Sequence, residues 1–375
     1  MTHPTELATL ADVAHLAGVS SATASRVLTG SARVRPQTRD KVEQAMTRLG
    51  YVRNRAARSP SNRRAGSIAL VMGEETVKVF ADPFFARVLG SVSREVSSVD
   101  FQLVMLTLHS PRDHHTVSRY LRSGHVDGAV FVSMHDKLDF DYESLGIPVV
   151  LCGRPVAGGA ALSYVDADNI GGASAAVRYL LDNGRKAVAT IAGPPDMAVG
   201  IDRLLGYRQP LRAVGVLDPG MIAYGDFSTM SGQHALLRLI DHRPGIDAVF
   251  AASDLMAAGA LHALRRLGRR VPHDVAVIGF DDLPVAQQTD PSLTTVRQPV
   301  DAMGTRMVTE ILARIADPGR EPSRIVLDTQ LILRGSALPA SVARSYAMGH
   351  PTSPTRPAPG GSGDSLIVRT SGRRL

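Results

Sequence analysis

The sequence lacks tryptophan, contains one cysteine and has no long apolar run. A single thiol, Cys152 among 375 residues, cannot form an intrachain disulfide framework, and such low cysteine usage fits a reducing compartment. No run of about 18 apolar residues occurs, so we expect no transmembrane helix. The first residues also lack a basic segment followed by an apolar one, which argues against a secretory signal peptide. We therefore expect a cytoplasmic protein.

The common catalytic and cofactor-binding motifs are also missing. The sequence has no Gly-x-Gly-x-x-Gly after a strand, no Walker A loop, no His-Glu-x-x-His and no Gly-x-Ser-x-Gly. We expect no enzyme activity, no cofactor and no metal site. The adjacent His114 and His115 follow Asp113 where a helix should begin, so we interpret them as helix-start residues. Cys152 is predicted to be a buried strand residue, not a nucleophile.

Positive charge is concentrated at the two ends of the chain. The net charge of +7 divides into +7 for residues 1–65, −4 for 66–337 and +4 for 338–375. A basic head on a mildly acidic body is typical of a nucleic-acid-binding module attached to a domain with another task.

The basic head has the pattern of short helices joined by a tight turn. Apolar residues recur at helical spacing at Leu10, Val13, Ala14 and Ala17. Thr9 can cap this helix, Gly18 can end it, and Ser20 can cap a second one. A third helix is predicted to begin at Pro36 and end before Gly50. The spacing alone fits a helix-turn-helix or an ordinary helical hairpin equally well, and the coincident basic charge favours DNA binding.

From Gly66 onward, short apolar runs alternate with amphipathic stretches. The runs cover residues 67–72, 101–106, 127–132, 148–153, 187–193, 247–253 and 274–280. This alternation predicts an α/β fold of doubly wound parallel sheets covered on both faces. We expect one lobe over 67–165 and a second over 166–295, with 296–322 returning to the first and 323–337 to the second. A ligand would lie between the lobes, near the carboxyl ends of the strands.

Three segments carry a family resemblance. DVAHLAGVSSATASRVLTG, VRPQTRDKVEQAMTRLGY and NRAARS resemble the head of the lactose-repressor (LacI/GalR) family of bacterial transcription regulators, and the resemblance continues through the core to about residue 337. It implies a small all-α helix-turn-helix head (1–50), a hinge (51–66) and a two-lobed core like the periplasmic binding proteins (67–337).

The resemblance also assigns DNA contacts to the second helix and the residue before it. Ser21, Ala22 and Arg26 occupy positions that face base edges, and Ser20, Thr23 and Ser25 occupy positions that reach phosphates. Arginine can donate two hydrogen bonds to guanine O6 and N7. Ser21 and Ala22 are small and can recognise little beyond a thymine methyl group or one hydrogen bond. Arg26 is therefore the expected specific base contact.

The hinge departs from the family pattern at one informative position. Asn54, Ala57 and Arg58 match a segment that folds into a short helix on the operator, but Pro60 stands where the family has a leucine wedge. Proline disfavours helix at the residue before it, yet it is itself used as an apolar wedge in minor grooves. We expect weaker DNA kinking; a plain flexible linker is the alternative.

Motif matches and positions at strand ends also define an effector site between the lobes. The predicted residues are Pro83, Phe84, Arg203, Phe227, Ser253, Asp281 and Gln298. A carboxylate that accepts from vicinal hydroxyls, a guanidinium that donates and nearby aromatic faces suit a polyhydroxylated ring. Ser253 stands where sugar-binding relatives commonly have asparagine. We expect the effector to be a sugar or a related polyol. The alternative is that each of these residues has a purely structural role, as part of an ion pair or as a core aromatic.

The remaining segment, 338–375, is rich in proline, glycine, serine and arginine and is expected to be disordered.

The resemblance implies an effector-responsive transcription regulator, acting as a repressor and binding a pseudo-palindromic operator as a homodimer at the nucleoid. The alternative is a solute-binding protein or an enzyme that shares the core fold without specific DNA binding.

Overall fold

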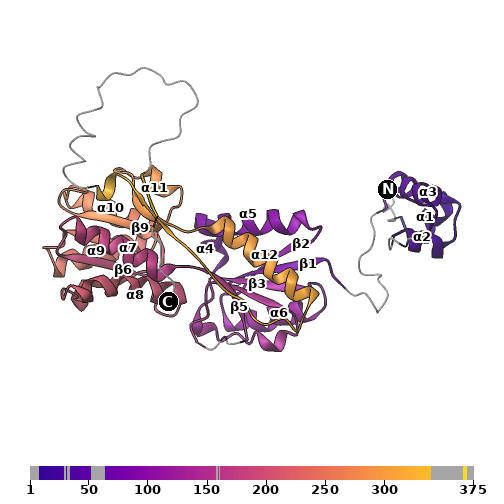
Figure 1. Cartoon of the computed structure of the whole chain (residues 1–375), viewed down its shortest axis with the longest axis horizontal. Coiled ribbons are helices and arrows are strands. Elements are labelled where there is room, and N and C mark those ends of the chain that lie inside the picture. The colour runs from indigo at the N-terminus through magenta and orange to yellow at the C-terminus, as the bar shows by residue number, and fades with distance from the viewer. Residues whose placement is uncertain are drawn as a thin grey trace, which may run out of the picture. The chain divides into compact units, whose positions relative to one another are not determined.

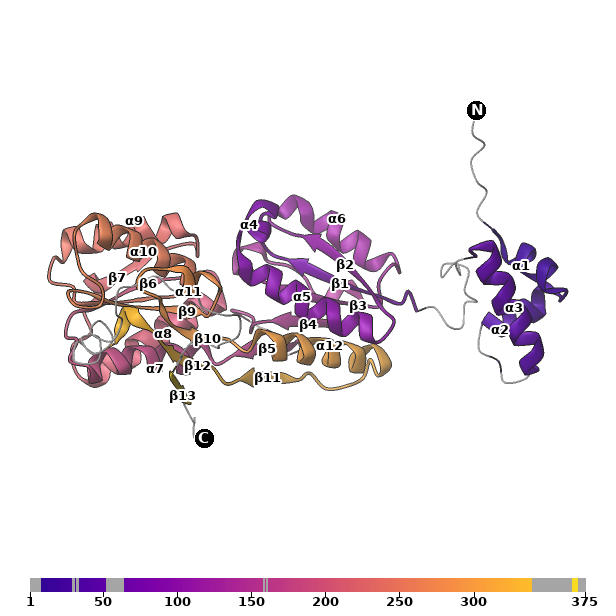
Figure 2. The ribbon, with the colours of Figure 1, turned by 90° about the horizontal axis from the view of Figure 1, so that it is seen from above.

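The computed structural model describes residues 8–28, 31, 34–51, 64–157, 159, 161–338 and 366–369. They fall into two compact units, Met1–Ala65 and Gly66–Leu375 (Figures 1 and 2). The first unit is the head and the second is the core, which contains two lobes.

The head is a three-helix unit with well-formed helix ends. Its helices are α1 (Leu10–Ala17), α2 (Ser21–Leu28) and α3 (Pro36–Leu49). Thr9 and Asp12 form a capping box at the start of α1, and Gly18 ends it with a φ of 66°. Ser20 Oγ accepts a hydrogen bond from the Thr23 backbone N–H at the start of α2. The small core consists of Val13, Ala14, Ala17, Ala24, Val27, Val42 and Ala45. The predicted helix-turn-helix is confirmed.

The first lobe is a six-stranded parallel sheet in the order β11-β5-β4-β3-β1-β2. The strands are β1 (Ser67–Met72), β2 (Gln102–Thr107), β3 (Gly128–Val132), β4 (Val149–Cys152), β5 (Ser163–Ala167) and β11 (Arg324–Leu327). The helices are α4 (Thr76–Ala81), α5 (Pro83–Ser98), α6 (Pro111–Arg122) and α12 (Val300–Ala316), with short 3-10 segments at Asp136–Leu138 and Glu143–Leu145.

Strand β1 shows why this sheet is buried on both sides. Ile68 and Leu70 pack in a cluster with α5 and α12, whereas Ala69 and Val71 pack in a cluster with α6. Successive residues of a strand point to opposite faces, so a continuous apolar run is required when helices cover both.

The second lobe is a seven-stranded sheet in the order β13-β12-β10-β9-β8-β6-β7. Its strands are β6 (Val188–Ala192), β7 (Ile222–Tyr224), β8 (Ala248–Ala251), β9 (Ala276–Asp281), β10 (Thr294–Arg297), β12 (Gln330–Leu333) and β13 (Leu366–Arg369). Its helices are α7 (Asn169–Asp182), α8 (Ala198–Ala213), α9 (Thr229–His242), α10 (Asp254–Arg266) and α11 (Val285–Gln288), with 3-10 segments at Pro219–Met221 and Gly335–Ala337. Strands β6 to β10 are parallel, and β12 and β13 are antiparallel to their neighbours. Helices α7 and α8 pack on one face of the sheet, and α9 and α10 on the other.

The chain crosses between the lobes three times, and the predicted crossing points need correction. The crossings fall between β5 and α7, between β10 and α12, and between β11 and β12 (Figure 2). The prediction that residues 323–337 belong to the second lobe is wrong for β11, which pairs with β5 of the first lobe. Strand β11 is a partly exposed edge strand, so its short alternating pattern did not reveal which sheet it joins.

Four residues of the C-terminal segment also depart from expectation. Residues 366–369 form β13 and pair with β12, so the prediction of disorder is wrong for them. The reason is local: the sequence Leu-Ile-Val-Arg has high β propensity, and an edge strand such as β12 offers unpaired backbone groups. The rest of that segment, 339–365 and 370–375, lies outside the described residues. In the part of the chain that is described, every helix is too short or too polar to cross a bilayer.

Candidate functional site

In the head, helix α2 exposes the side chains predicted to read DNA. Ser21, Ala22 and Arg26 are exposed, whereas Ala24 and Val27 face the helical core. Of the predicted phosphate contacts, Ser20 is exposed, and Thr23 and Ser25 are half-buried. The helix therefore buries a small apolar side and presents short polar groups and one guanidinium to solvent, as major-groove reading requires. The predicted hinge contacts Asn54, Ala57, Arg58 and Pro60 lie outside the described residues.

In the core, a pocket lies where strands of both sheets end. We call it the inner pocket; its cavity volume is about 90 Å³. Of the predicted effector residues it is lined by Phe84, Arg203, Phe227, Ser253, Asp281 and Gln298. Pro83 does not line it; Pro83 is the first residue of α5, next to Asp82, whose carboxylate accepts a hydrogen bond from the Phe84 N–H at 2.9 Å. A proline at that position starts the helix and has no N–H to offer a ligand.

Asp281, the last residue of β9, forms the central ion pair of the inner pocket. Its Oδ1 lies 3.0 Å from Nη1 of Arg203 and accepts a hydrogen bond from Gln298 Nε2 at 2.6 Å. Burial raises the pKa of Asp281, and the Arg203 guanidinium opposes this rise. The two side chains are only 8% and 3% exposed. Within the described residues its second oxygen, Oδ2, has no hydrogen-bond partner, and a carboxylate oxygen can accept from a hydroxyl.

Arg203, on α8, is held in a fixed orientation by the second lobe. Its Nε donates to Asn169 Oδ1 at 2.9 Å, and its Nη1 donates to the Ala252 carbonyl at 2.6 Å. The guanidinium carbon lies 3.7 Å from the centre of the Phe280 ring. Burial lowers the pKa of Arg203, although Asp281 opposes that change, and a guanidinium remains protonated in any case. A preorganised donor of this kind loses little entropy when a ligand binds.

Phe227 and Ser253 are neighbours in the wall of the inner pocket. Ser253 caps α10, accepting from the Met256 N–H at 3.2 Å, and its hydroxyl lies 3.5 Å from the Phe227 carbonyl. The Phe227 ring lies so close to Gly193 that a side chain on that glycine would overlap it. Ser253 is therefore partly committed to the fold, because its hydroxyl oxygen already accepts the capping hydrogen bond at the start of α10.

Three residues lining the inner pocket have left-handed backbone conformations. The φ angles are 59° at Ser133, 71° at Phe227 and 113° at Asp281. Such angles are unfavourable for residues with side chains and persist only where the surrounding structure imposes them. The strain aims Phe227 and Asp281 into the pocket.

Sequence reasoning missed several polar residues that line the same pocket. They are Glu74, Lys78, Asp82, Asp166 and Asn169. Glu74 lies two residues after the end of β1, a position that strand-end reasoning could have flagged. Asp166 and Asn169 lie at the end of β5, a strand whose sequence SYVDA is too polar to be recognised as buried.

Cys152 and the histidine pair behave as structural residues. Cys152 ends β4 and is half-buried against the pocket, and burial raises its pKa to about 12, so its thiol is protonated near neutral pH. Asp113 closes a capping box with Ser110 at the start of α6, and His114 packs edge-on against Phe140. Among the described residues, no group of three or more His, Cys, Asp or Glu is arranged to hold a metal ion.

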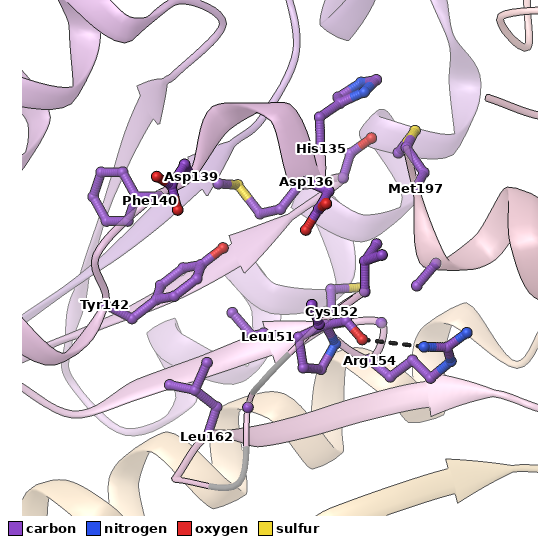
Figure 3. A pocket seen from close by; sticks show the side chains of 18 of the residues that line it. His135, Asp136, Asp139, Phe140, Tyr142, Leu151, Cys152, Arg154, Leu162 and Met197 are labelled. Atoms are coloured by element: carbon purple, nitrogen blue, oxygen red, sulfur yellow. Dashed lines mark hydrogen bonds between the residues drawn. The ribbon is translucent and has the colours of Figure 1, made fainter. Parts of the chain in front are cut away.

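A second pocket opens beside the inner one, and we call it the outer pocket (Figure 3). The two pockets share a wall made of Ser133, Cys152, Gly153, Met197 and Val199. The outer pocket has a cavity volume of about 300 Å³ and lies between loops of the first lobe and the start of α8.

Two charged bridges join the lobes next to this shared wall. His135 Nδ1 lies 3.0 Å from Asp196 of the second lobe, while its Nε2 lies 3.2 Å from Glu74 of the first. Arg154 of the first lobe donates from Nε and Nη2 to the Asp202 carboxylate of the second, at 2.7 and 2.5 Å. Burial lowers the pKa of His135, but the carboxylates of Glu74 and Asp196 outweigh it, and the net pKa is raised.

Comparisons with known proteins agree with this arrangement. Residues 9–54 match the family model of bacterial regulatory proteins of the lacI family, and residues 177–337 match that of a periplasmic binding protein-like domain. The HTH-type transcriptional regulator CelR of Thermobifida fusca is 46% identical over 332 residues, covering 88% of this chain and 98% of that protein. The transcriptional repressor CytR of Escherichia coli (strain K12) is 33% identical, covering 88% and 97%.

Solved structures give the same result. A CelR–cellobiose complex matches with a TM-score of 0.71 and 44% identity, covering 88% of this chain and all of that one. A lac repressor dimer bound to operator and the anti-inducer ONPF matches with a TM-score of 0.79 and 25% identity, covering 89% and 100%. The relatives are transcriptional regulators rather than enzymes, and the chain belongs to the LacI family of DNA-binding transcriptional regulators.

Proposed function

We propose that this regulator is a repressor that releases or holds its operator in response to a sugar or a related polyol bound in the inner pocket. The observation that carries the proposal is the buried pair of Asp281, at the end of β9, and Arg203, on α8, in a pocket that Phe84 of the first lobe also lines. A carboxylate and a guanidinium fixed side by side can accept from and donate to neighbouring hydroxyls of one ring. Sugar-responsive relatives support this: CelR has been solved with cellobiose, and ribose operon repressors are 30–31% identical to this chain.

The coupling follows from where the effector would lie. A ligand that contacts Phe84 and Asp281 together stabilises one arrangement of the two lobes, and it shifts the equilibrium only by its difference in affinity for the two arrangements. We propose that this shift changes the spacing of two heads in a homodimer on a pseudo-palindromic operator, since two-fold protein symmetry matches two-fold operator symmetry. The lac repressor dimer bound to operator supports the dimer. Such a protein would work in the cytoplasm, at the nucleoid.

On the DNA side, we propose that Arg26 reads a guanine while Ser21 and Ala22 lie against neighbouring base edges. Ser20, Thr23 and Ser25 would contact phosphates and set the register of the helix. The hinge proposal assigns Asn54, Ala57 and Arg58 to the minor groove, with Pro60 as a weakened wedge. Operator bending by the wild type and by Pro60→Leu tests that part: a larger bend for the leucine variant supports it, and equal bends refute it.

An electrophoretic mobility-shift titration tests the DNA-binding part. Full-length protein and Arg26→Ala are titrated against candidate operator DNA, with Arg122→Ala as a control that removes the same charge from an exposed site on α6. We expect Arg26→Ala to weaken specific binding and Arg122→Ala to leave it unchanged. Equal losses in both variants would mean that bulk charge, not α2, determines binding.

Isothermal titration calorimetry with a panel of sugars tests the effector part. Asp281→Asn keeps the shape of the side chain but removes its charge, and it should lose sugar binding while the operator shift survives. Loss of both activities would instead make Asp281 a structural residue.

A further inference from the structure

Asp281 belongs to a strained two-residue turn. It ends β9, Asp282 follows it, and their φ angles are 113° and 56°. Such backbone is unfavourable for residues with side chains, so the surrounding structure has to hold it. Asp281 lines the inner pocket, whereas Asp282 lines neither the inner nor the outer pocket. The direction of the pocket carboxylate therefore depends on a neighbour that lies outside the pocket.

Arg297 and Arg334 bind the carboxylate of Asp282, and we call these three residues the aspartate clamp. Arg297 Nε, at the end of β10, donates to Oδ2 at 2.6 Å, and Arg334 Nη2, directly after β12, donates to Oδ1 at 2.7 Å. The Asp282 and Arg334 side chains are each 7% exposed, and Arg334 also donates to the Leu293 carbonyl at 2.9 Å. Both carboxylate oxygens are engaged, so two other segments of the second lobe hold the turn.

The clamp lies next to the hydrogen bond that orients Asp281. Arg297 and Gln298 are consecutive residues: the first binds Asp282, and the second donates from Nε2 to Asp281 Oδ1 at 2.6 Å. In the parallel register of β9 and β10, Arg297 lies opposite Asp281. Loosening Asp282 would therefore displace Asp281 from Gln298 and from Arg203, its partner in the ion pair.

The same turn contacts the first lobe. Arg87, on α5, donates from Nη1 to the Asp282 carbonyl at 3.4 Å, and its Nη2 lies 3.9 Å from the Asp301 carboxylate on α12. Helices α5 and α12 belong to the first lobe, and Asp282 belongs to the second. One guanidinium thus joins the first lobe to the peptide group beside the pocket carboxylate.

We propose that Asp282 is a positioning residue that connects the effector pocket to the first lobe. Its clamped carboxylate fixes the turn that directs Asp281 at the effector, and its carbonyl is the contact through which Arg87 responds to that turn. The proposal rests on the effector site proposed above. It adds a route of coupling within the protein: a ligand that moves Asp281 changes a contact between the lobes and so favours one arrangement of them.

Hydrogen–deuterium exchange on the ligand-free full chain tests whether the clamp holds the turn. The amide of Leu283 donates to Asp254 Oδ2 at 2.7 Å, so it exchanges slowly while the turn is intact. Asp282→Asn keeps the shape of the side chain and suits left-handed backbone, but it removes the charge that both arginines bind. We expect exchange at Leu283 to become about tenfold faster or more.

Asp274→Asn is the matched control for that experiment. It breaks a carboxylate–arginine pair of the same lobe, with Arg270 at 2.7 Å, before the start of β9. Exchange at Leu283 should stay as in the wild type. Equal protection of Leu283 in the wild type and in Asp282→Asn would overturn the proposal, whatever the effector is.

Isothermal titration calorimetry with glucose, ribose and cellobiose tests the positioning role. Asp282→Asn should weaken the sugar that the wild type binds best about tenfold, and Asp274→Asn should stay within twofold. Arg334→Met should weaken it similarly, whereas Arg334→Lys keeps the charge opposite Asp282 and should recover part of the loss. Thermal melts on the same samples verify that each variant is folded during the titration. Unchanged affinity in Asp282→Asn, or equal losses in the two Arg334 variants, would refute the positioning role.

Mobility shifts with and without saturating sugar test the contact with the first lobe. The measured quantity is the ratio of the two operator affinities. Arg87→Ala should bring this ratio about threefold closer to one, because it removes the contact with the Asp282 carbonyl. Arg94→Ala is the matched control: Arg94 lies on the same helix, also pairs with Asp301, at 2.6 Å, and should leave the ratio unchanged. An unchanged ratio in Arg87→Ala, or equal changes in both variants, would refute the link.

The outcomes separate this proposal from the sugar effector. If the wild type bound none of the three sugars but still shifted its operator, the sugar effector would be refuted. The exchange experiment needs no ligand and would then decide on its own whether the clamp holds the turn.

Discussion

The head and the core place their proposed functional residues in opposite environments. In the head, Arg26 and Ser21 are exposed, and the hydrophobic cluster beneath them consists of a few small side chains. In the core, Arg203 and Asp281 are almost fully buried and already hydrogen-bonded to the protein. A surface that reads DNA needs reach and charge, whereas a pocket that recognises a neutral ligand needs donors and acceptors fixed before binding.

This contrast predicts how function and stability are linked in each region. Side chains of the head that meet DNA can change without affecting folding, because they pack against little. Side chains of the effector pocket are part of a buried hydrogen-bond network, so their substitution changes binding and stability together. The comparison can be tested from either side.

The largest effect is expected for Arg203→Ala. Removing this cation leaves Asp281 buried without its partner and the acceptors Asn169 and Ala252 unsatisfied, which costs about 3–5 kcal/mol of the free energy of unfolding. Urea denaturation of the core and sugar calorimetry on the same sample measure both losses. If the variant lost sugar binding but kept the free energy of unfolding of the wild type, the pocket residues would not contribute to stability. The proposed difference between the core and the head would then be wrong.

Arg26→Ala should show the opposite behaviour. We expect a loss of about 1–3 kcal/mol in operator affinity and relaxed preference at one base pair, with an unchanged melting temperature. Quantitative mobility shifts on a set of single-base operator variants, with thermal melts in parallel, provide the two readings. A uniform loss across all operator variants would reassign Arg26 to a phosphate.

Val42→Ala tests the same comparison by removing part of a buried side chain from the hydrophobic cluster of the head. Val42 is fully buried in α3, and its truncation should cost about 2 kcal/mol, a large share of what a three-helix unit has. Operator binding should then fail at a lower temperature while sugar affinity stays the same. If sugar affinity fell equally, the head and the core would not be independent folding units.

The smallest effect concerns the His135 bridge between the lobes. Because the folded-state pKa of His135 is raised, its stabilisation is fully present below the unfolded value of about 6.5 and is lost as the pH rises through the folded value. Differential scanning fluorimetry of the wild type and His135→Gln should show a difference of a few degrees or less near pH 6 that shrinks toward pH 9. His262→Gln, an exposed change on α10, is the control; a difference that is constant with pH would show that the imidazolium is not the source.

Sequence reasoning was most successful where structure is determined locally. The strand predicted over 67–72 has the same bounds as β1, and Thr9 and Gly18 end α1 as their chemistry predicts. In these cases a few neighbouring residues determine the outcome, through alternation on a strand or a capping hydrogen bond.

It was least successful where distant segments determine the outcome. The sequence of β11 is compatible with either sheet, and only its pairing with β5 places it in the first lobe. Asp166 and Asn169 look like loop residues in the sequence. In the structure, Asn169 Nδ2 donates to Asp166 Oδ1 at 2.9 Å, which orients Asn169 to accept a hydrogen bond from Arg203. Arg203 and Asp281 were predicted by family resemblance, since nothing in their local sequence shows that residues 78 positions apart lie 3.0 Å from each other.

The three passages of the chain between the lobes have a practical meaning for protein engineering. The head is attached through one connection, so a recombinant hybrid that exchanges it needs one junction. Neither lobe is a continuous stretch of sequence, because α12 and β11 return to the first lobe after the second has been laid down. Moving the ligand specificity of a relative into this chain therefore requires transplanting the whole core as one piece, or grafting individual side chains into the pocket. Exchanging a single lobe would need a junction at each of the three crossings.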